Sequence, residues 1–416
     1  MSRLRAPGLA PILAVVALAC GHPDTSRVAV SHDGTALVGR THKVHGVTTV
    51  EFPADAFDRA AQYVLDTVPI AILGRVGDRQ KRVWFSKVEF LASGGYASMS
   101  FTGAESHLLF FDSTGLLLHT VGAGSVSSLL ALGDTLLVAG SGGLTYLTSG
   151  GDTLETVSSS PQPTNPEFLG QGWPVGRLDA GHLVWQVPMP SAPDTTRSVR
   201  TPVGVVISGM MHDSARLVDS IPGLEKRPIV VHYEDHDRTR VVDVWFSYYP
   251  RIVVWDNRIA VATGANGYAI DLLDTDGHLA RRVHVAVPRR PVTQEMRDSL
   301  RIQMTRVQWP FDHVEGTPIG AEARAYRLAL QPFADSLPAY GSIYATRRGV
   351  LWVLDDTSLG DTAWNATAFR SDGAILGRLH GSGMTPTAFD DDRLVVRTPD
   401  GGRGVSFKVF RFRLPK

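Results

Sequence analysis

Short hydrophobic runs separated by turns rich in Gly and Asp dominate the chain after about residue 80. The clearest group contains four runs rich in Val, Ile, Leu and aromatic residues, namely Ile252–Trp255, Ile259–Thr263, Tyr268–Leu273 and Leu279–Val285. Residues typical of tight hairpin turns separate the first run from the second, at Asp256-Asn257, and the third from the fourth, at Asp274-Thr275-Asp276-Gly277. Four consecutive antiparallel strands of this kind predict one blade of a β-propeller.

The same succession of runs and turns repeats along the chain and predicts further blades. The other units are Phe85–Val121, Ser127–Ser158, Pro174–Ser220, Ser342–His380 and a last one from Thr385 to Leu414. The last unit has only three runs, and an incomplete blade would expose a sheet edge. Val47–Glu51 is rich in β-branched residues and has no neighbouring run, so we expect this N-terminal strand to complete the last blade.

The expected fold class is therefore all-β, a six-bladed β-propeller that occupies residues 42–416. Seven blades remain an alternative, because Val68–Leu73 and Ile229–Trp245 also contain runs with strand character. We interpret both of these runs as insertions.

Residues 286–341, between the fourth and fifth predicted blades, have a different pattern. Met296, Leu300 and Met304 are four residues apart, as are Tyr326 and Leu330, which predicts two amphipathic helices. The simplest role for their apolar stripes is packing on the propeller. A mobile lid is the alternative.

The N-terminus has the residue order of a secretory signal. Arg3 and Arg5 precede an apolar run from Leu9 to Leu18, which is too short to span a bilayer, and Ala19 and Cys20 follow the run. Ala17–Cys20 is similar to a bacterial lipobox, although Leu18 stands one position later than usual. We expect a signal peptide at 1–19, a lipidated Cys20 and a polar tether at 20–41. A cleavable signal that happens to contain a cysteine is the alternative.

Composition excludes several functional classes. Lys plus Arg and Asp plus Glu both number 41, so no basic excess favours nucleic acid as a partner. Cys20 is the sole cysteine, which excludes an internal disulfide framework and zinc or iron–sulfur sites with several cysteines. The 41 Gly and 25 Pro residues fit a chain with many turns.

Several short segments resemble a group of exported bacterial six-bladed, NHL-like β-propeller lipoproteins. They are Gly46–Glu51, Leu109–Gly115, Arg290–Thr293 with Glu295, Leu337–Gly341 and Leu351–Val353. The chain departs from the group at Val121–Ser125, where a Gly-Pro-Gly-Glu-Phe loop is missing. The resemblance implies the fold and an exported, lipid-anchored location, and it carries over no catalytic residue.

Metal chemistry has weak support in the sequence. The Asp-Gly turns lack the ligand order of a calcium loop, so we interpret them as hairpin turns. His232 and His236 lie in the densest group of possible metal ligands, and they would share a face if one strand ran through both. The group falls between two strand runs, which favours a solvated hairpin tip over a metal site.

Propeller geometry gathers alternate loops on one face around the central channel, where ligands of propellers generally bind. The predicted loops on this face include Ser247–Arg251, Gly264–Gly267, Pro188–Pro202 and Asp355–Asn365. The candidate ligand-binding residues on it are Trp245, Tyr248, Tyr249, Arg251, Trp309, Asp312 and His313. Aromatic rings beside an arginine can hold a sugar, a peptide or an anion, and aromatic wedging between blades is the alternative.

The leading hypothesis is an exported lipoprotein, periplasmic, at the cell surface or on the outer membrane, that binds an envelope protein, peptide or glycan without catalysis. We expect a monomer with no cofactor and no membrane contact beyond the lipid anchor. The alternative is an extracytoplasmic propeller hydrolase or lyase for a carbohydrate or lactone, with a divalent metal held by acidic residues and His in the channel. Convergent carboxylates would favour the enzyme, and apolar or paired channel walls would favour the binding protein.

Overall fold

The computed structural model describes most of the chain from residue 29 to residue 414. The described residues are 29–30, 36–73, 84–102, 105–124, 126–133, 135–140, 143–157, 172–179, 181–190, 194–209, 215–232, 236–264, 267–306, 313–314, 317–318, 321–356, 363–399 and 405–414. The expected signal peptide, Cys20, Trp309 and Asp312 lie outside the described residues.

Strands that follow one another in the chain pair antiparallel into sheet units. The first unit contains β7 (Trp84–Phe90), β8 (Tyr96–Thr102), β9 (Glu105–Phe111) and β10 (Leu117–Gly124). The second contains β11 (Val126–Leu132), β12 (Thr135–Gly140), β13 (Gly143–Thr148) and β14 (Thr153–Val157). The third contains β15 (Trp173–Arg177), β16 (His182–Pro188), β17 (Val199–Gly209), β18 (Ala215–His232) and β19 (Asp237–Asp243).

The remaining units follow the same order. The fourth contains β20 (Arg251–Trp255), β21 (Arg258–Ala262), β22 (Tyr268–Leu273) and β23 (Leu279–Val285). The fifth contains β26 (Tyr340–Ala345), β27 (Leu351–Asp355), β28 (Ala363–Phe369) and β29 (Ile375–Ser382), and the sixth contains β30 (Thr385–Phe389), β31 (Arg393–Pro399) and β32 (Val405–Arg413).

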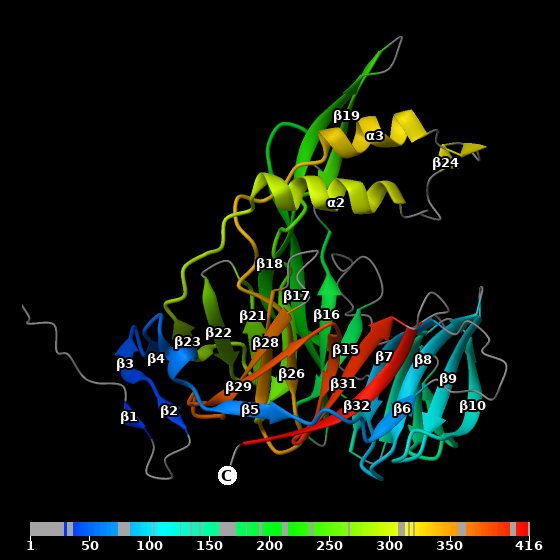
Figure 1. Cartoon of the computed structure of the whole chain (residues 1–416), viewed down its shortest axis with the longest axis vertical. Helices are drawn as coiled ribbons and strands as arrows, with labels where there is room; N and C mark the ends of the chain where they lie inside the picture. The colour runs from blue at the N-terminus through cyan, green and yellow to red at the C-terminus, as the bar shows by residue number, and fades with distance from the viewer. Residues whose placement is uncertain are drawn as a thin grey trace, which may run out of the picture.

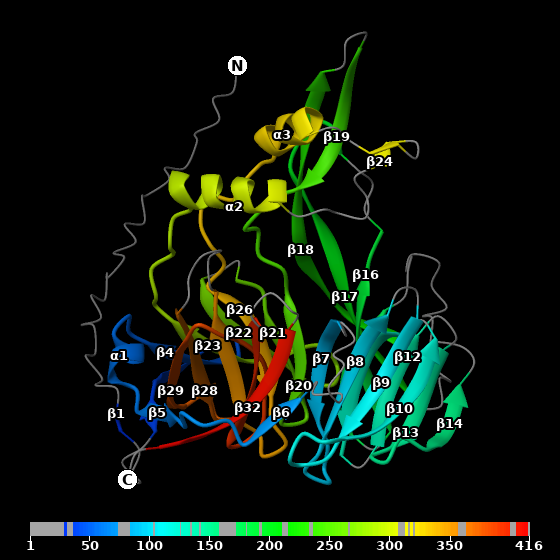
Figure 2. The same cartoon turned by 45° about the vertical axis from the view of Figure 1, so that its right-hand side comes forward.

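The first strand of each unit is its innermost strand. Each of β7, β11, β15, β20 and β26 contacts the next in this order, and β30 contacts both β26 and β7, so the inner strands close a circle. Figures 1 and 2 show the sheets standing side by side around this circle. Sheets arranged radially around a central channel form a β-propeller.

Hydrophobic clusters between neighbouring units hold the sheets together. One of them joins the fourth and fifth units through Trp255, Tyr268 and Phe369, and another joins the fifth and sixth, where Trp352 stacks on Phe389 at 5.0 Å between ring centroids. The rings thus act as wedges between sheets, as strands with both faces covered require.

The N-terminal strand does not complete the last unit as we expected. β4 (Val47–Phe52) instead pairs parallel with β23 on the outer edge of the fourth unit, and β3 (Arg40–Val44) pairs with β4. Val50 and Phe52 are buried in the cluster between the fourth and fifth units. The β-branched pattern thus identified a strand, but burial of its apolar face selected a different partner.

A strand that we interpreted as an insertion fills the expected position. β6 (Ala71–Leu73) pairs antiparallel with β32, placing Leu73 opposite Phe407. β5 (Gln62–Leu65) pairs with both β29 and β32 and so joins the fifth and sixth units into one sheet. The fourth strand of the last unit is therefore β6, which directly precedes the first unit in the chain.

Part of the expected tether also belongs to the fold. β1 (Ala29–Val30) pairs with β2 (Leu37–Val38), and Leu37 forms a bridge with Ile375 of the fifth unit. Leu37 is buried, so its apolar side chain explains why this part of the segment is structured.

The second expected insertion, Ile229–Trp245, extends the third sheet. β18 continues past the other sheets and pairs with β19, forming a hairpin that projects from one face (Figure 1). The expected helices are α2 (Gln294–Arg306) and α3 (Ala321–Leu330), and the short pair β24 (His313–Val314) and β25 (Thr317–Pro318) lies between them in the chain. Both helices lie over the face from which the hairpin projects (Figures 1 and 2).

Helix α2 packs on a small core outside the sheets. Val292, Leu300, Phe333 and Leu337 are buried together, with Met296 and Met304 against them. The stripe of α2 therefore has a packing role, although against this separate core, whereas Tyr326 of the α3 stripe is exposed. Among the described helices, none combines the length and the apolar character needed to cross a membrane.

Candidate ligand-binding face

The inner strands line a central cavity of about 490 Å³. Its described lining comes from all six inner strands and consists mostly of residues with apolar side chains, with Lys87, Glu89, Arg177 and Arg347 as its charged residues. Lys87 Nζ lies 2.8 Å from Glu89 Oε1, and Arg347 Nη2 lies 3.0 Å from Asp390 Oδ2. Glu89 is the single carboxylate of this lining, and its charge is balanced by Lys87.

The opening of the channel on the loop-bearing face forms a hollow of about 230 Å³, which we call the channel mouth. Its polar side chains include Ser128, Gln186, Arg251 and Ser342, together with Lys87. Most of these groups donate hydrogen bonds, so the mouth is suited to a ligand rich in acceptor oxygens.

Tyr249 contacts two residues that line the channel mouth. Gln186 Nε2 donates a hydrogen bond to the Tyr249 hydroxyl at 2.8 Å, and the Arg251 guanidinium lies 5.8 Å from the Tyr249 ring centroid. Burial raises the pKa of Tyr249, although the hydrogen bond from Gln186 and the charge of Arg251 oppose the rise. The ring is therefore a neutral support that positions a donor and a cation.

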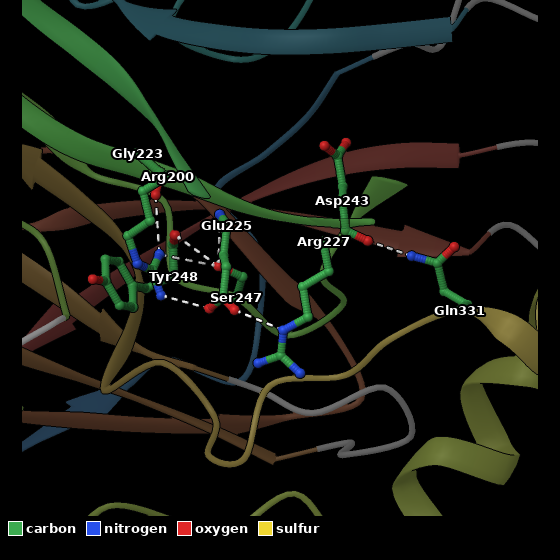
Figure 3. Close-up of polar contacts among 8 residues, drawn as sticks. All are labelled: Arg200, Gly223, Glu225, Arg227, Asp243, Ser247, Tyr248 and Gln331. Atoms are coloured by element: carbon green, nitrogen blue, oxygen red, sulfur yellow. Dashed lines mark hydrogen bonds and ion pairs between the residues drawn. The ribbon is translucent and has the colours of Figure 1, made fainter. Parts of the chain in front are cut away.

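Next to the mouth, a polar group that we call the Arg200 cluster ties the base of the β17–β18 ladder to the chain before β20 (Figure 3). Glu225 accepts hydrogen bonds from Arg200 Nη2 at 2.9 Å and from Arg227 Nε at 2.8 Å. Ser247 Oγ accepts from Arg200 at 3.2 Å and from the Glu225 amide at 3.1 Å. Tyr248 packs beneath Arg200, with 3.6 Å between the guanidinium carbon and the ring centroid.

Most contacts of the Arg200 cluster are made within the cluster, which keeps a formal net charge of +1. One carboxylate bridges two arginines, and Arg200 also donates to the Gly223 carbonyl at 3.0 Å. Such a network fixes backbone position rather than leaving donors for a ligand. Tyr248 therefore packs against Arg200 within this network.

Trp245 is part of the core under the helices. Its ring meets Phe333 edge to face, with 5.3 Å between centroids and 82° between planes, and its backbone bonds to Pro332 and Ala334. Phe246 then adopts the left-handed region with φ of +59°, which is rare for a bulky residue. Of the four neighbouring candidates, Arg251 alone lines the described mouth, and Tyr249 contacts its lining residues Gln186 and Arg251.

The other sequence candidates do not join this site within the described residues. His313 lies on β24, of which the structure describes the backbone alone, and the views of Figures 1 and 2 place this strand away from the sheets. β18 ends at His232 and β19 begins at Asp237, so His232 and His236 lie at the end of a hairpin and share no continuous strand. His232 Nδ1 lies 2.7 Å from Asp237 Oδ1 in an exposed pair.

One group of possible metal ligands occurs among the described residues, in the turn between β22 and β23. It consists of Asp274, Asp276 and His278. Asp274 Oδ1 accepts hydrogen bonds from the backbone amides of Asp276 and His278, both at 2.9 Å. These bonds make Asp274 the hairpin-turn residue that the sequence predicts.

A further cavity of about 340 Å³, which we call the interblade pocket, opens between the fourth and fifth units. Its walls are α1 (Ala56–Arg59), the loop at Gly264, the two chain segments that lead to and from the helices, and the adjoining ends of β27 and β28. Sequence reasoning placed the loops 264–267 and 355–365 on this face but singled out none of their residues. The sequence did contain one indication of this site, because Asp355 directly follows the hydrophobic run Leu351–Leu354.

Asp355 and Arg378 form the charged centre of the interblade pocket. Arg378 Nη2 donates to Asp355 Oδ2, and the guanidinium lies 4.5 Å from the ring centroid of Phe57 on α1. Burial raises the pKa of Asp355 to about 6, against the opposing charges of Arg378 and Arg290. A perturbed carboxyl in a cavity is a recognised mark of functional sites.

Comparison with known proteins gives structural likeness alone. No family model matches the chain, and no curated protein matches it. The WD40 domain of Pan2 from Neurospora crassa is 8% identical with a TM-score of 0.39, covering 84% of this chain and 95% of that one. Regucalcin, a calcium-binding protein from Agrobacterium tumefaciens, is 13% identical with a TM-score of 0.32, covering 88% and 97%.

A Bacteroides caccae protein of unknown function is 10% identical with a TM-score of 0.32, covering 72% of this chain and 82% of that one. All three scores are low, so the propeller assignment rests on the circle of inner strands and the clusters between sheets. The comparisons identify no family for this chain.

Proposed function

We propose that this chain is an exported, lipid-anchored six-bladed β-propeller that binds an envelope protein, peptide or glycan on its loop-bearing face without catalysing a reaction. The observation that carries the proposal is the channel mouth, where Gln186 and Arg251 contact Tyr249 and where the single carboxylate of the described channel lining, Glu89, is paired with Lys87. Positioned donors over a closed circle of sheets suit recognition.

The metal-dependent hydrolase alternative needs several convergent carboxylates or histidines. The described lining of the channel offers Glu89 for this purpose, and Lys87 already neutralises it. This pairing favours binding over metal-assisted chemistry.

The proposal is tested with immobilised arrays of bacterial glycans and of acidic peptides, probed with the purified full-length protein. We expect binding to one array class, weakened at least about tenfold by Arg251→Ala because a charge-assisted hydrogen bond is lost. Arg348→Ala is the matched control, since Arg348 is exposed on the turn after β26, at the opposite end of an inner strand.

Equal binding by the wild type and Arg251→Ala would contradict a site at the mouth. A thermal-shift series with EDTA, calcium and zinc addresses the alternative, because a metal bound by the native state raises its melting temperature. Stabilisation by a metal that EDTA reverses would favour the hydrolase.

A further inference from the structure

We propose that the interblade pocket binds a neutral saccharide unit through its hydroxyl groups, with Asp355 and Arg378 as the recognising pair. This inference rests on the proposed binding function and assigns a second site on the same face. The pocket volume of about 340 Å³ lies at the lower end of the range of about 300–1,000 Å³ for small-molecule pockets. It therefore suits a small ligand or the end of a longer glycan.

The charges around the pocket favour a neutral ligand. Its lining contains three carboxylates and three guanidinium groups, on Asp58, Asp355, Asp356, Arg289, Arg290 and Arg378. Because these formal charges cancel, the site has no net attraction for an ion of either sign. An ammonium group would meet the arginines, and a carboxylate would meet the acids.

The unpaired polar atoms of Asp355 and Arg378 favour a ligand with a hydroxyl group. Asp355 Oδ2 takes a hydrogen bond from Arg378, while Asp355 Oδ1 and Arg378 Nε are both buried without a hydrogen-bond partner. The first is an acceptor and the second a donor. A hydroxyl group both donates and accepts, whereas an ammonium only donates and a carboxylate only accepts.

The remaining walls suit the carbon skeleton of a sugar. Phe57, Leu337 and Pro338 contribute apolar surface beside the charged centre. The alternation of hydroxyls and C–H groups on a saccharide matches a pocket that combines polar and apolar walls.

The pocket is also preformed. The two chain segments on one side of it are tied together by backbone hydrogen bonds from Val292 to Asp335 at 3.0 Å and from Leu337 to Arg290 at 2.8 Å. Both Val292 and Leu337 are anchored in the core under the helices. A wall held in this way lowers the ordering cost of binding.

Calorimetric titration of the full-length protein in detergent tests the inference. The probes are glucose, galactose and N-acetylglucosamine, with acetate and methylammonium as charged comparators. We expect at least one sugar to bind and both ions to fail. Asp355→Asn should weaken sugar binding at least about tenfold, because an ionised acceptor is lost.

A second variant distinguishes a loss of sugar binding from a loss of folding. Ala363 lies exposed at the pocket rim, so Ala363→Tyr should obstruct the pocket while leaving the Asp355–Arg378 pair intact. Asp276→Asn in the exposed turn is the matched control for Asp355→Asn, and melting temperatures report folding.

The outcomes separate this inference from the proposed function. Sugar binding that is lost in Asp355→Asn and Ala363→Tyr and retained in Arg251→Ala supports the interblade site. Sugar binding that is lost only in Arg251→Ala overturns the inference and leaves binding at the mouth intact. Failure of every sugar, or binding of an ion instead, overturns the inference, while the array experiment decides the proposed function separately.

Discussion

The pKa of Asp355 depends on two opposing features of its surroundings. Its side chain is 24% exposed and lies against Arg378, so burial and an opposite charge act on it in opposite directions. Burial is the stronger effect, because the pKa rises to about 6 from an ordinary value of 3.8. Perturbed carboxyl groups are enriched at functional sites, and structural ion pairs also produce them.

This shift predicts a specific dependence of stability on pH. Between pH 3.8 and 6 the folded protein holds a proton at Asp355 that the unfolded chain has lost, so this group adds stability as the pH falls from 7 towards 4. Asp355→Asn lacks this proton. The free energy of unfolding of the wild type relative to Asp355→Asn should therefore increase by roughly 1–3 kcal/mol between pH 7.5 and 4.5.

Urea denaturation of both proteins at the two pH values measures this difference. Asp276→Asn, in the exposed turn, controls for the substitution itself. A gap between the wild type and Asp355→Asn that does not change with pH would show that Asp355 does not have this raised pKa.

At the scale of elements, the short strand β6 has a role that its length does not predict. Leu73 is buried in the cluster between the sixth and first units, opposite Phe407. On its other side the turn at Gly115 approaches it closely, because a Cβ on Gly115 would lie 2.8 Å from the Ile72 carbonyl oxygen. β6 therefore links the last unit to the first.

Leu73→Ala should destabilise the protein by about 2–4 kcal/mol, because it removes buried apolar surface and leaves a cavity at the closure of the circle. Val68→Ala is the matched control, since Val68 is 72% exposed and its truncation should cost less than about 0.5 kcal/mol. Chemical denaturation followed by tryptophan fluorescence compares the two. Equal effects would mean that β6 does not contribute to closure.

At the scale of the whole molecule, a second contact reinforces this closure. Arg393 of the sixth unit donates to the Gly94 carbonyl of the first at 3.2 Å and lies 4.9 Å from the Phe90 ring centroid. Arg393 also contacts Asp390 at 2.5 Å, and Asp390 bonds to Arg347 of the fifth unit. The junction between the last and first units is thus held by the pairing of β6 with β32 and by the contacts of Arg393.

Anchoring of the whole protein is a prediction from the sequence. Cells that grow with a clickable palmitate should label the wild type, and Cys20→Ser should lose the label because the chain then has no thiol to lipidate. The label on the wild type should survive neutral hydroxylamine, which cleaves thioesters, because the acyl chains would be held by oxygen-ester and amide bonds. A wild-type protein that never takes up the label would refute the anchor.

The sequence alone determined the features that depend on neighbouring residues. Tyr268–Leu273 and Leu279–Val285 are strands with the predicted bounds, and Asp274 forms the predicted turn, because alternation and turn chemistry act within a few residues. The helices α2 and α3 follow from spacing in the same way.

Only the tertiary structure decided which strands pair over long distances and which side chains meet. β4 and β6 are both short β-type runs, and their partners depend on which buried surface each can complete. Trp245 and Arg251 are near neighbours in the chain, yet Trp245 packs in the core under the helices and Arg251 lines the channel mouth. Asp355 and Arg378 lie on different strands, so their pairing, and the pocket around it, arise from packing between sheets that no local pattern encodes.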